Sequence, residues 1–128
     1  AFSAVTAAYR LPKDTPDQET QRAAAIQEAL VGAADVPVRT AETASEVVGL
    51  AGQILDGANE NVLSDVAVAA ASARAGYEAA VVNVEINKAS IDDAGHRGGL
   101  VARMKPIRRQ VDESLRILAA VNRRVGTP

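Results

Sequence analysis

Apolar residues cover most of the circumference of residues 61–92 when this segment is drawn as a helix with about 100° per residue. Apart from Asp65, the charged side chains are confined to one narrow stripe that includes Arg74, Glu78, Glu85 and Lys88. A second stripe has small side chains in its middle and polar side chains at its ends. It consists of Asp65, Ala69, Ser72, Gly76, Ala79, Asn83 and Asn87. We call these residues the small-polar stripe. A helix that is apolar nearly all round is predicted to be central, with its buried polar groups paired or used for chemistry.

The first part of the chain also follows helical spacing, and prolines mark the helix ends. Residues 1–11 are predicted to be the end of a helix that Pro12 closes. Thr15 is predicted to cap the next helix, with Pro16 at its first position and Gln18 completing a capping box.

Pro37 interrupts this second helical pattern. It removes one backbone donor and clashes with the preceding turn, so a kink or break after about Asp35 is predicted. The helix is expected to resume over residues 38–55 and to end at Gly57.

The last third of the chain is predicted to hold a loop and a closing helix. Residues 92–99 contain three glycines and are expected to be the loop. The helix is expected over residues 100–124 with a bend at Pro106, and its inward-facing residues are predicted to be Val101, Met104, Ile107, Val111, Leu115 and Leu118.

Strand-type alternation is missing, so the predicted class is all-α. The architecture is an antiparallel helical bundle of long helices, one of them kinked at Pro37, and residues 1–128 form a single domain. Hydrophobic residues make up 48% of the chain but aromatic residues only 2%, and much of the apolar content is alanine. Such a core buries little area per residue, which favours stabilisation by oligomerisation.

Charge and composition exclude several classes of function. The net charge of −2 gives no general basic field for nucleic acid, and the arginines of the last third are interspersed with Asp112 and Glu113, as on a solvated helix face. No apolar run approaches the ~18 residues of a membrane span. The absence of cysteine excludes disulfides and thiolate metal sites. We expect a cytoplasmic protein that binds neither membrane nor nucleic acid.

Besides Asn83 and Asn87, four polar residues are candidates for a functional site. Arg10 and Lys13 lie at a helix-to-loop junction, where they either complement the helix dipole or clamp an anionic ligand. Ser64 is a candidate cap for the long helix and places Asp65 in its first turn. Asp65 is then either a dipole partner or a functional carboxylate, and its place on the small-polar stripe favours the second interpretation.

Asn83 and Asn87 lie on an otherwise apolar helix face. Asparagine is a poor helix former and is costly to bury unpaired, so these amides either bind a ligand, a second subunit or a bent backbone, or form a core network. Asp65 and Asn83 are 18 residues apart, about 27 Å along a straight helix. They therefore serve one elongated ligand or meet across an antiparallel pair of subunits, but cannot both touch one small reacting centre.

The single histidine, His96, is flanked by Gly95 and Arg97 without an evident carboxylate or cysteine partner, and it is predicted to be a surface residue. Gly98 and Gly99 lack the strand and spacing of a phosphate-binding loop. The sequence has no nucleophile motif and no cluster of metal ligands, so acid–base chemistry on a bound ligand is the candidate chemistry that remains.

An ordered set of segments resembles the cyclodeaminase/cyclohydrolase family, which includes the C-terminal domain of formiminotransferase-cyclodeaminase and stand-alone methenyltetrahydrofolate cyclohydrolases. The matching segments are AFSAV at 1–5, RLPK at 10–13, TP at 15–16, VP at 36–37 with Ala41, SDVAVAA at 64–70, NVEIN at 83–87 and ID at 91–92. After Asp92 only a generic closing helix matches. The upstream glycine- and alanine-rich segment of the family is absent from the numbered chain.

The resemblance implies an all-helical homodimer that acts on one-carbon-substituted tetrahydrofolate, with no metal and no cofactor beyond this substrate. It implies that Asp65 shuttles a proton or stabilises the cationic methenyl bridge. Arg10 and Lys13 would hold the glutamate carboxylates of the ligand. Asn83 and Asn87 would bind the pterin edge or brace the interface, and Ser64 would belong to the same substrate site.

Two reactions fit this resemblance. A cyclohydrolase adds water to the 5,10-methenyl bridge and gives 10-formyltetrahydrofolate, whereas a cyclodeaminase closes the bridge on formiminotetrahydrofolate and releases ammonia. A short chain with no transferase domain favours the cyclohydrolase. The non-enzymatic alternative is a helical domain whose polar stripe serves only dimerisation.

Overall fold

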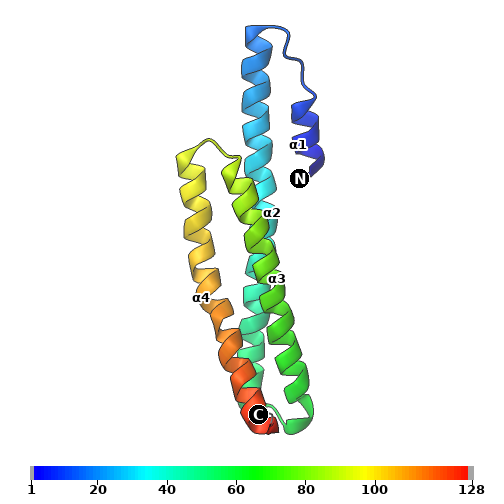
Figure 1. Ribbon diagram of the computed structural model, residues 1–128, viewed down its shortest axis with the longest axis vertical. Coiled ribbons are helices and arrows are strands. Elements are labelled where there is room, and N and C mark those ends of the chain that lie inside the picture. Colours follow the sequence, from blue (N-terminus) through cyan, green and yellow to red (C-terminus); the bar gives the residue numbers. More distant parts are fainter. Residues whose placement is uncertain (1, 127–128) are drawn as a thin grey trace.

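Alanine-rich segments with apolar residues three and four positions apart fold into long α-helices, as the sequence predicts. The computed structural model describes residues 2–126, and over this range it contains four α-helices, one 3₁₀ turn and no strand (Figure 1). The elements are α1 (Phe2–Tyr9), α2 (Pro16–Gly57), η1 (Glu60–Val62), α3 (Leu63–Ala89) and α4 (Ala94–Val125). The all-α class is confirmed. Ala1, where the first predicted helix begins, lies outside the described residues.

Helix α2 is the scaffold of the bundle. The short α1 packs along its first half, while α3 runs antiparallel to its second half and α4 returns beside both (Figure 1). Helix α2 packs extensively against α1, α3 and α4, whereas α3 packs mainly against α2 and α4. The prediction that residues 61–92 form the central helix is therefore wrong, because α2 takes that place.

The start of α2 is built as its sequence predicts. Thr15 Oγ1 accepts a hydrogen bond from the Gln18 backbone N–H at 3.3 Å, and Pro16 occupies the first turn, where no donor is missed. Gln18 Oε1 reaches back to the backbone N–H of Asp14 at 2.9 Å, one residue before the usual partner in a capping box. At the other end Gly57 closes the helix without a positive φ angle, since Gly126 alone has one among the described residues.

Pro37 does not break α2. The helix is continuous from Pro16 to Gly57, so the prediction that it ends near Asp35 and resumes at residue 38 is wrong. Ala34, Val38 and Ala41 are fully buried on both sides of the proline. Their packing outweighs the roughly 3 kcal/mol that an interior proline costs.

The predicted loop over residues 92–99 is also wrong, because α4 already begins at Ala94. Asp93 Oδ1 caps its first turn by accepting a hydrogen bond from the His96 backbone N–H at 2.7 Å. Arg97 donates from Nη1 to the carbonyl oxygens of Ile91 and Asp92 and ties the helix to the preceding turn. These contacts offset the low helix propensity of the glycines.

In α3, the N-cap position is Val62 with no side-chain cap, so Ser64 does not cap this helix.

The buried seam of α4 follows a seven-residue repeat of Leu100, Ile107, Ser114 and Val121, with Val111 and Ile117 between them. Val101 and Leu115 were predicted to face inward but are more than half exposed, because they fall one position beyond this narrow seam. Helix α3 likewise leaves Val68, Val82 and Ile86 exposed to about 60%. One long apolar face of the bundle is thus not covered by the described chain.

We predict that replacing Pro37 by alanine raises the free energy of unfolding by about 1–3 kcal/mol, because alanine restores the missing backbone donor in a helix that is already continuous. Urea denaturation followed by circular dichroism measures this. Pro16→Ala is the control and should bring no gain, since Pro16 lies where the donor is not needed. A Pro37→Ala variant no more stable than the parent protein would contradict the explanation.

Candidate functional site

The small-polar stripe of α3 does not face the core but forms one wall of a surface groove. One hollow of about 490 Å³ lies between α2 and α3 beside Ala69, Ser72 and Gly76. A second hollow of about 610 Å³ continues along the same two helices beside Ala79, Asn83 and Asn87. Both hollows include Thr40 and Gly76 in their lining, so they form one continuous groove. We call it the α2–α3 groove, and six of the seven stripe residues line it.

The groove carries no charge of its own. Within residues 2–126, the side chains that line it are all uncharged; from α1 and α2 they are Phe2, Val5, Leu30, Ala33, Val36, Pro37, Thr40, Thr43, Ala44 and Val47. Its polar groups are the hydroxyls of two threonines and Ser72 and the two asparagine amides. The groove is therefore a long surface of apolar side chains and neutral hydrogen-bonding groups, which suits an extended ligand or a second helix.

The two amides are fixed by their own helix. Asn83 Nδ2 donates to the Ala79 carbonyl oxygen at 3.0 Å, and Asn87 Nδ2 donates to the Asn83 carbonyl oxygen at 2.8 Å. Asn83 is exposed and Asn87 half-buried, which rules out the predicted alternative of a core network. Because each amide nitrogen is held by backbone, the Oδ1 atoms are the groups positioned to accept a hydrogen bond at the groove.

The remaining predicted site residues lie outside this groove. Ser64 and Asp65 are exposed in the first turn of α3, at the far end of that helix from Asn87. Arg10 and Lys13 lie in the connection between α1 and α2, near the opposite end of the molecule (Figure 1). In the part of the chain that the structure describes, none of these four side chains forms an ion pair or a hydrogen bond with another side chain. A single chain therefore does not bring the carboxylate and the cations together.

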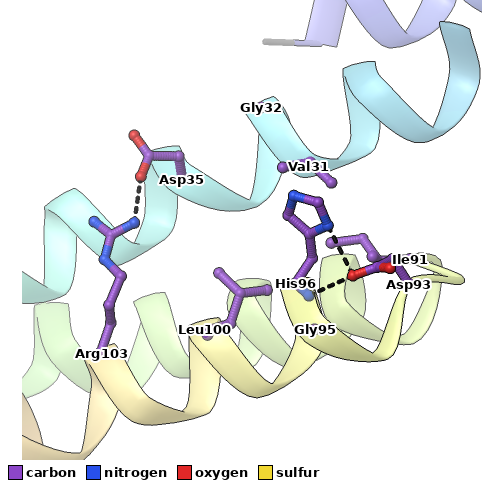
Figure 2. A pocket seen from close by; sticks show the side chains of 10 residues that line it. Val31, Gly32, Asp35, Ile91, Asp93, Gly95, His96, Leu100 and Arg103 are labelled. Atoms are coloured by element: carbon purple, nitrogen blue, oxygen red, sulfur yellow. Dashed lines mark hydrogen bonds and ion pairs between the residues drawn. The ribbon is translucent and has the colours of Figure 1, made fainter.

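A cavity of about 850 Å³ between α2 and the start of α4 was not predicted from the sequence (Figure 2). His96 lines it, and its Nδ1 lies 2.9 Å from Asp93 Oδ1. The prediction of a histidine without a carboxylate partner is wrong, because Asp93 caps α4 and thereby comes within reach of the ring. Hydrogen bonds from the backbone and side chain of His96 hold the pKa of Asp93 below its usual value.

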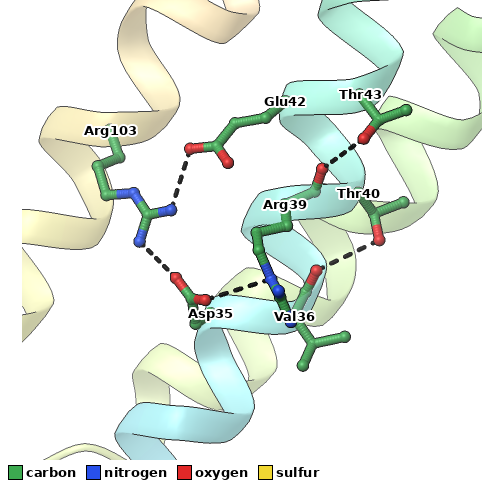
Figure 3. Close-up of polar contacts among 7 residues, drawn as sticks. All are labelled: Asp35, Val36, Arg39, Thr40, Glu42, Thr43 and Arg103. Atoms are coloured by element: carbon green, nitrogen blue, oxygen red, sulfur yellow. Dashed lines mark hydrogen bonds and ion pairs between the residues drawn. The ribbon is translucent and has the colours of Figure 1, made fainter.

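Asp35 and Arg103 line the other end of this cavity (Figure 2), and Figure 3 shows the ion pairs that they form. Arg103 Nη1 lies 2.6 Å from Asp35 Oδ1, and Arg103 Nη2 lies 3.0 Å from Glu42 Oε1. Arg39 Nε approaches Asp35 Oδ2 at 3.4 Å. The hydrogen bond from Arg103 is the largest cause that lowers the pKa of Asp35. The charges at this end neutralise one another, so they serve to hold α4 against α2.

Long helices and an uncharged groove together define a helical-bundle protein with an elongated surface for a ligand or partner. A model of the formiminotransferase-cyclodeaminase family matches residues 1–106. The chain belongs to this family, as its sequence motifs indicate.

Individual relatives differ in their assigned reactions. The chain is 46% identical over 93 residues to a methenyltetrahydrofolate cyclohydrolase from Methylorubrum extorquens, covering 73% of this chain and 45% of that protein. Formimidoyltransferase-cyclodeaminases from Mus musculus and Rattus norvegicus are 39% and 38% identical over 93 residues, which is 17% of their length. The match thus spans less than half the length of these relatives. No helix within residues 2–126 is long and apolar enough to cross a membrane.

We predict that Arg103→Gln lowers stability by about 0.5–1 kcal/mol at neutral pH, as expected for an exposed ion-pair network. The pKa of Asp35 in the folded protein lies below the usual 3.8 of an aspartate side chain, so its pairing stabilises the fold above about that pH and is lost as pH falls through the folded-state pKa. The difference in melting temperature between the parent protein and Arg103→Gln should therefore shrink between pH 6 and pH 3.

The control for this series is Arg109→Gln, since Arg109 forms no ion pair within the described range. Its melting temperature should follow that of the parent protein at each pH. A constant difference for Arg103→Gln over the whole series would contradict the role of Asp35.

Proposed function

We propose that the protein is a methenyltetrahydrofolate cyclohydrolase, which adds water to the cationic 5,10-methenyl bridge, releases a proton and gives 10-formyltetrahydrofolate. The observation that carries this proposal is the uncharged α2–α3 groove with its fixed amide oxygens. A groove without lysine or arginine does not repel a cationic bridge, and carbonyl dipoles stabilise positive charge next to them. The Methylorubrum relative, named for this reaction, supports the assignment.

The same groove is proposed to bind a second copy of the chain. Gly76 lies in the middle of the small-polar stripe, eleven residues from Asp65 and eleven from Asn87. If α3 packs antiparallel on its symmetry mate with the two-fold axis at Gly76, Asp65 comes to the level of Asn87 of the partner subunit. A Cβ atom at Gly76 would meet nothing within 4 Å, so the axis position is open in the single chain.

Exposed apolar side chains support this pairing. Val68, Val82 and Ile86 on α3 and Leu50 and Ile54 on α2 are each more than half exposed. Covering them adds the apolar burial that an alanine-rich core lacks. The homodimer thus provides both the missing stability and the missing half of the site.

Within this dimer each predicted residue has a place along one elongated ligand. Asp65 accepts the proton that the attacking water loses, and Ser64 lies beside it. Asn83 and Asn87 of the other subunit accept hydrogen bonds from the pterin edge. Arg10 and Lys13 lie in the connection between α1 and α2, beyond the end of α3 that carries Asn87. They bind the glutamate carboxylates. The tetrahydrofolate is the substrate, and we propose neither a further cofactor nor a metal. The proposed location is the cytoplasm.

Formiminotetrahydrofolate cyclodeamination is the second candidate, because the family description and the two rodent relatives carry that name. In that reaction N10 attacks the formimino carbon and ammonia leaves, so a proton must again be moved at the same bridge. The two activities are separated by their products, since only the cyclodeaminase releases ammonia.

We predict that the protein accelerates the loss of methenyltetrahydrofolate absorbance above the spontaneous rate, and that Asp65→Asn reduces this rate about 10²–10⁴-fold. Asparagine keeps the size and part of the interaction with the helix N-terminus, so the free energy of unfolding should fall by no more than about 1 kcal/mol.

Asp56→Asn is the matched control, an exposed carboxylate near the end of α2 that lies outside the groove. It should retain the parent rate. Ammonia release from the formimino substrate without methenyl hydrolysis would replace the first candidate by the second. If neither reaction is accelerated and no reduced folate raises the melting temperature, the remaining interpretation is a dimerisation domain.

A further inference from the structure

A separate cleft of about 270 Å³ lies between α3 and α4. Its lining shares no residue with the α2–α3 groove, because it lies on the opposite side of α3. The apolar floor consists of Val84 and Leu100, both buried, together with the half-buried Val81 and Met104. The volume is near the lower end of small-molecule sites, so any ligand must be small.

The rim of this cleft has an excess of positive charge. Lys88, Lys105 and Arg108 line it against the single carboxylate of Glu85. Glu85 Oε2 forms an ion pair with Lys88 Nζ at 2.6 Å. Over residues 2–126, Lys105 and Arg108 form neither an ion pair nor a side-chain hydrogen bond. They are three residues apart on one helix, where like charges destabilise the helix slightly. No ion pair within the described residues therefore accounts for this pair of cations.

Tyr77 adds a neutral polar group to the same wall. Its side chain is only 6% exposed and lines the cleft beside Arg108. Burial is the main cause that raises the pKa of this phenol, so it keeps its proton at neutral pH and stays a hydrogen-bond donor. The cleft therefore combines an apolar floor with donors and cations at its edge, and its unpaired charges are of one sign.

We propose that this cleft binds a small organic anion, a carboxylate on a short apolar body. The carboxylate pairs with Lys105 and Arg108 at the rim, and the apolar body lies on Val84, Leu100 and Met104. Charge complementarity selects this occupant, because a neutral or cationic molecule of the same shape leaves the cations unpaired. The site is independent of the proposed folate reaction and is tested without measuring turnover.

The chain offers a local reporter for this test. It contains no tryptophan and two tyrosines, so Tyr9→Phe leaves Tyr77 as the single tyrosine fluorophore. Titration of the full Tyr9→Phe protein with octanoate should give a saturable change in Tyr77 fluorescence. The double change Lys105→Gln and Arg108→Gln should weaken binding at least about tenfold, because it removes charge-assisted hydrogen bonds to the carboxylate. Octanamide, which keeps the shape without the charge, should also bind at least about tenfold more weakly.

The matched control is the double change Arg109→Gln and Arg123→Gln, which removes the same charge from exposed positions outside the cleft. It should leave the affinity for octanoate unchanged. The proposal is overturned if octanoate gives no saturable change up to on the order of 10 mM, or if octanamide binds equally well. It is also overturned if the control weakens binding as much as the cleft variant. Displacement of octanoate by tetrahydrofolate in competition would assign the cleft to the folate site instead and would equally contradict a separate anion site.

Discussion

Close packing of small side chains is the interaction on which this molecule depends. Ala34, Ala41 and Ala70 are fully buried between the long helices, where larger residues would hold the backbones apart. Such contacts align the helices well, but each alanine removes little apolar area from water. The bundle is therefore long and thin, and its apolar surface is larger than one chain can cover.

This imbalance explains why the small-polar stripe lies at the surface. Helix α3 uses Val66, Tyr77 and Val84 to pack on its neighbours and leaves the opposite side, with Gly76 at its centre, along an open groove. A stripe of small residues is what a second helix needs for a close approach. In the proposed dimer the same surface both completes the core and brings Asp65 to the amides of the partner subunit. Stability and catalysis then rest on one interface.

The sequence was sufficient for features that depend on local chemistry. Thr15 and Pro16 start α2 as predicted, and the all-α class follows from the spacing of apolar residues. Features decided by tertiary packing were predicted wrongly. Burial carries α2 through Pro37, and the cap of Asp93 draws the glycine-rich segment into α4. Propensity alone could not weigh those contacts.

The sequence predicted which face of the helix carries the candidate site residues, but not where that face lies in the fold. Periodicity placed Asn83 and Asn87 on one stripe with Asp65, yet it could not say that the stripe lines a groove and not the core. The pairing of His96 with Asp93 was equally hidden, because it depends on where α4 begins. The spacing of about 27 Å between Asp65 and Asn83 did indicate that the two residues serve one elongated ligand or meet across an antiparallel pair of subunits, and this inference stays a prediction.

Cross-linking tests the central claim most directly, because the chain contains no cysteine. Asp65 and Asn87 are about 33 Å apart along α3 of one chain, whereas a disulfide requires Cα atoms within about 7 Å. Mild oxidation of the double variant Asp65→Cys and Asn87→Cys should therefore give a covalent dimer on a denaturing gel, while either single variant should stay uncross-linked. A mixture of the two single variants should again give the covalent dimer. A double variant that remains monomeric under these conditions, or a covalent dimer from Asp65→Cys alone, would contradict the antiparallel pairing of α3 about Gly76.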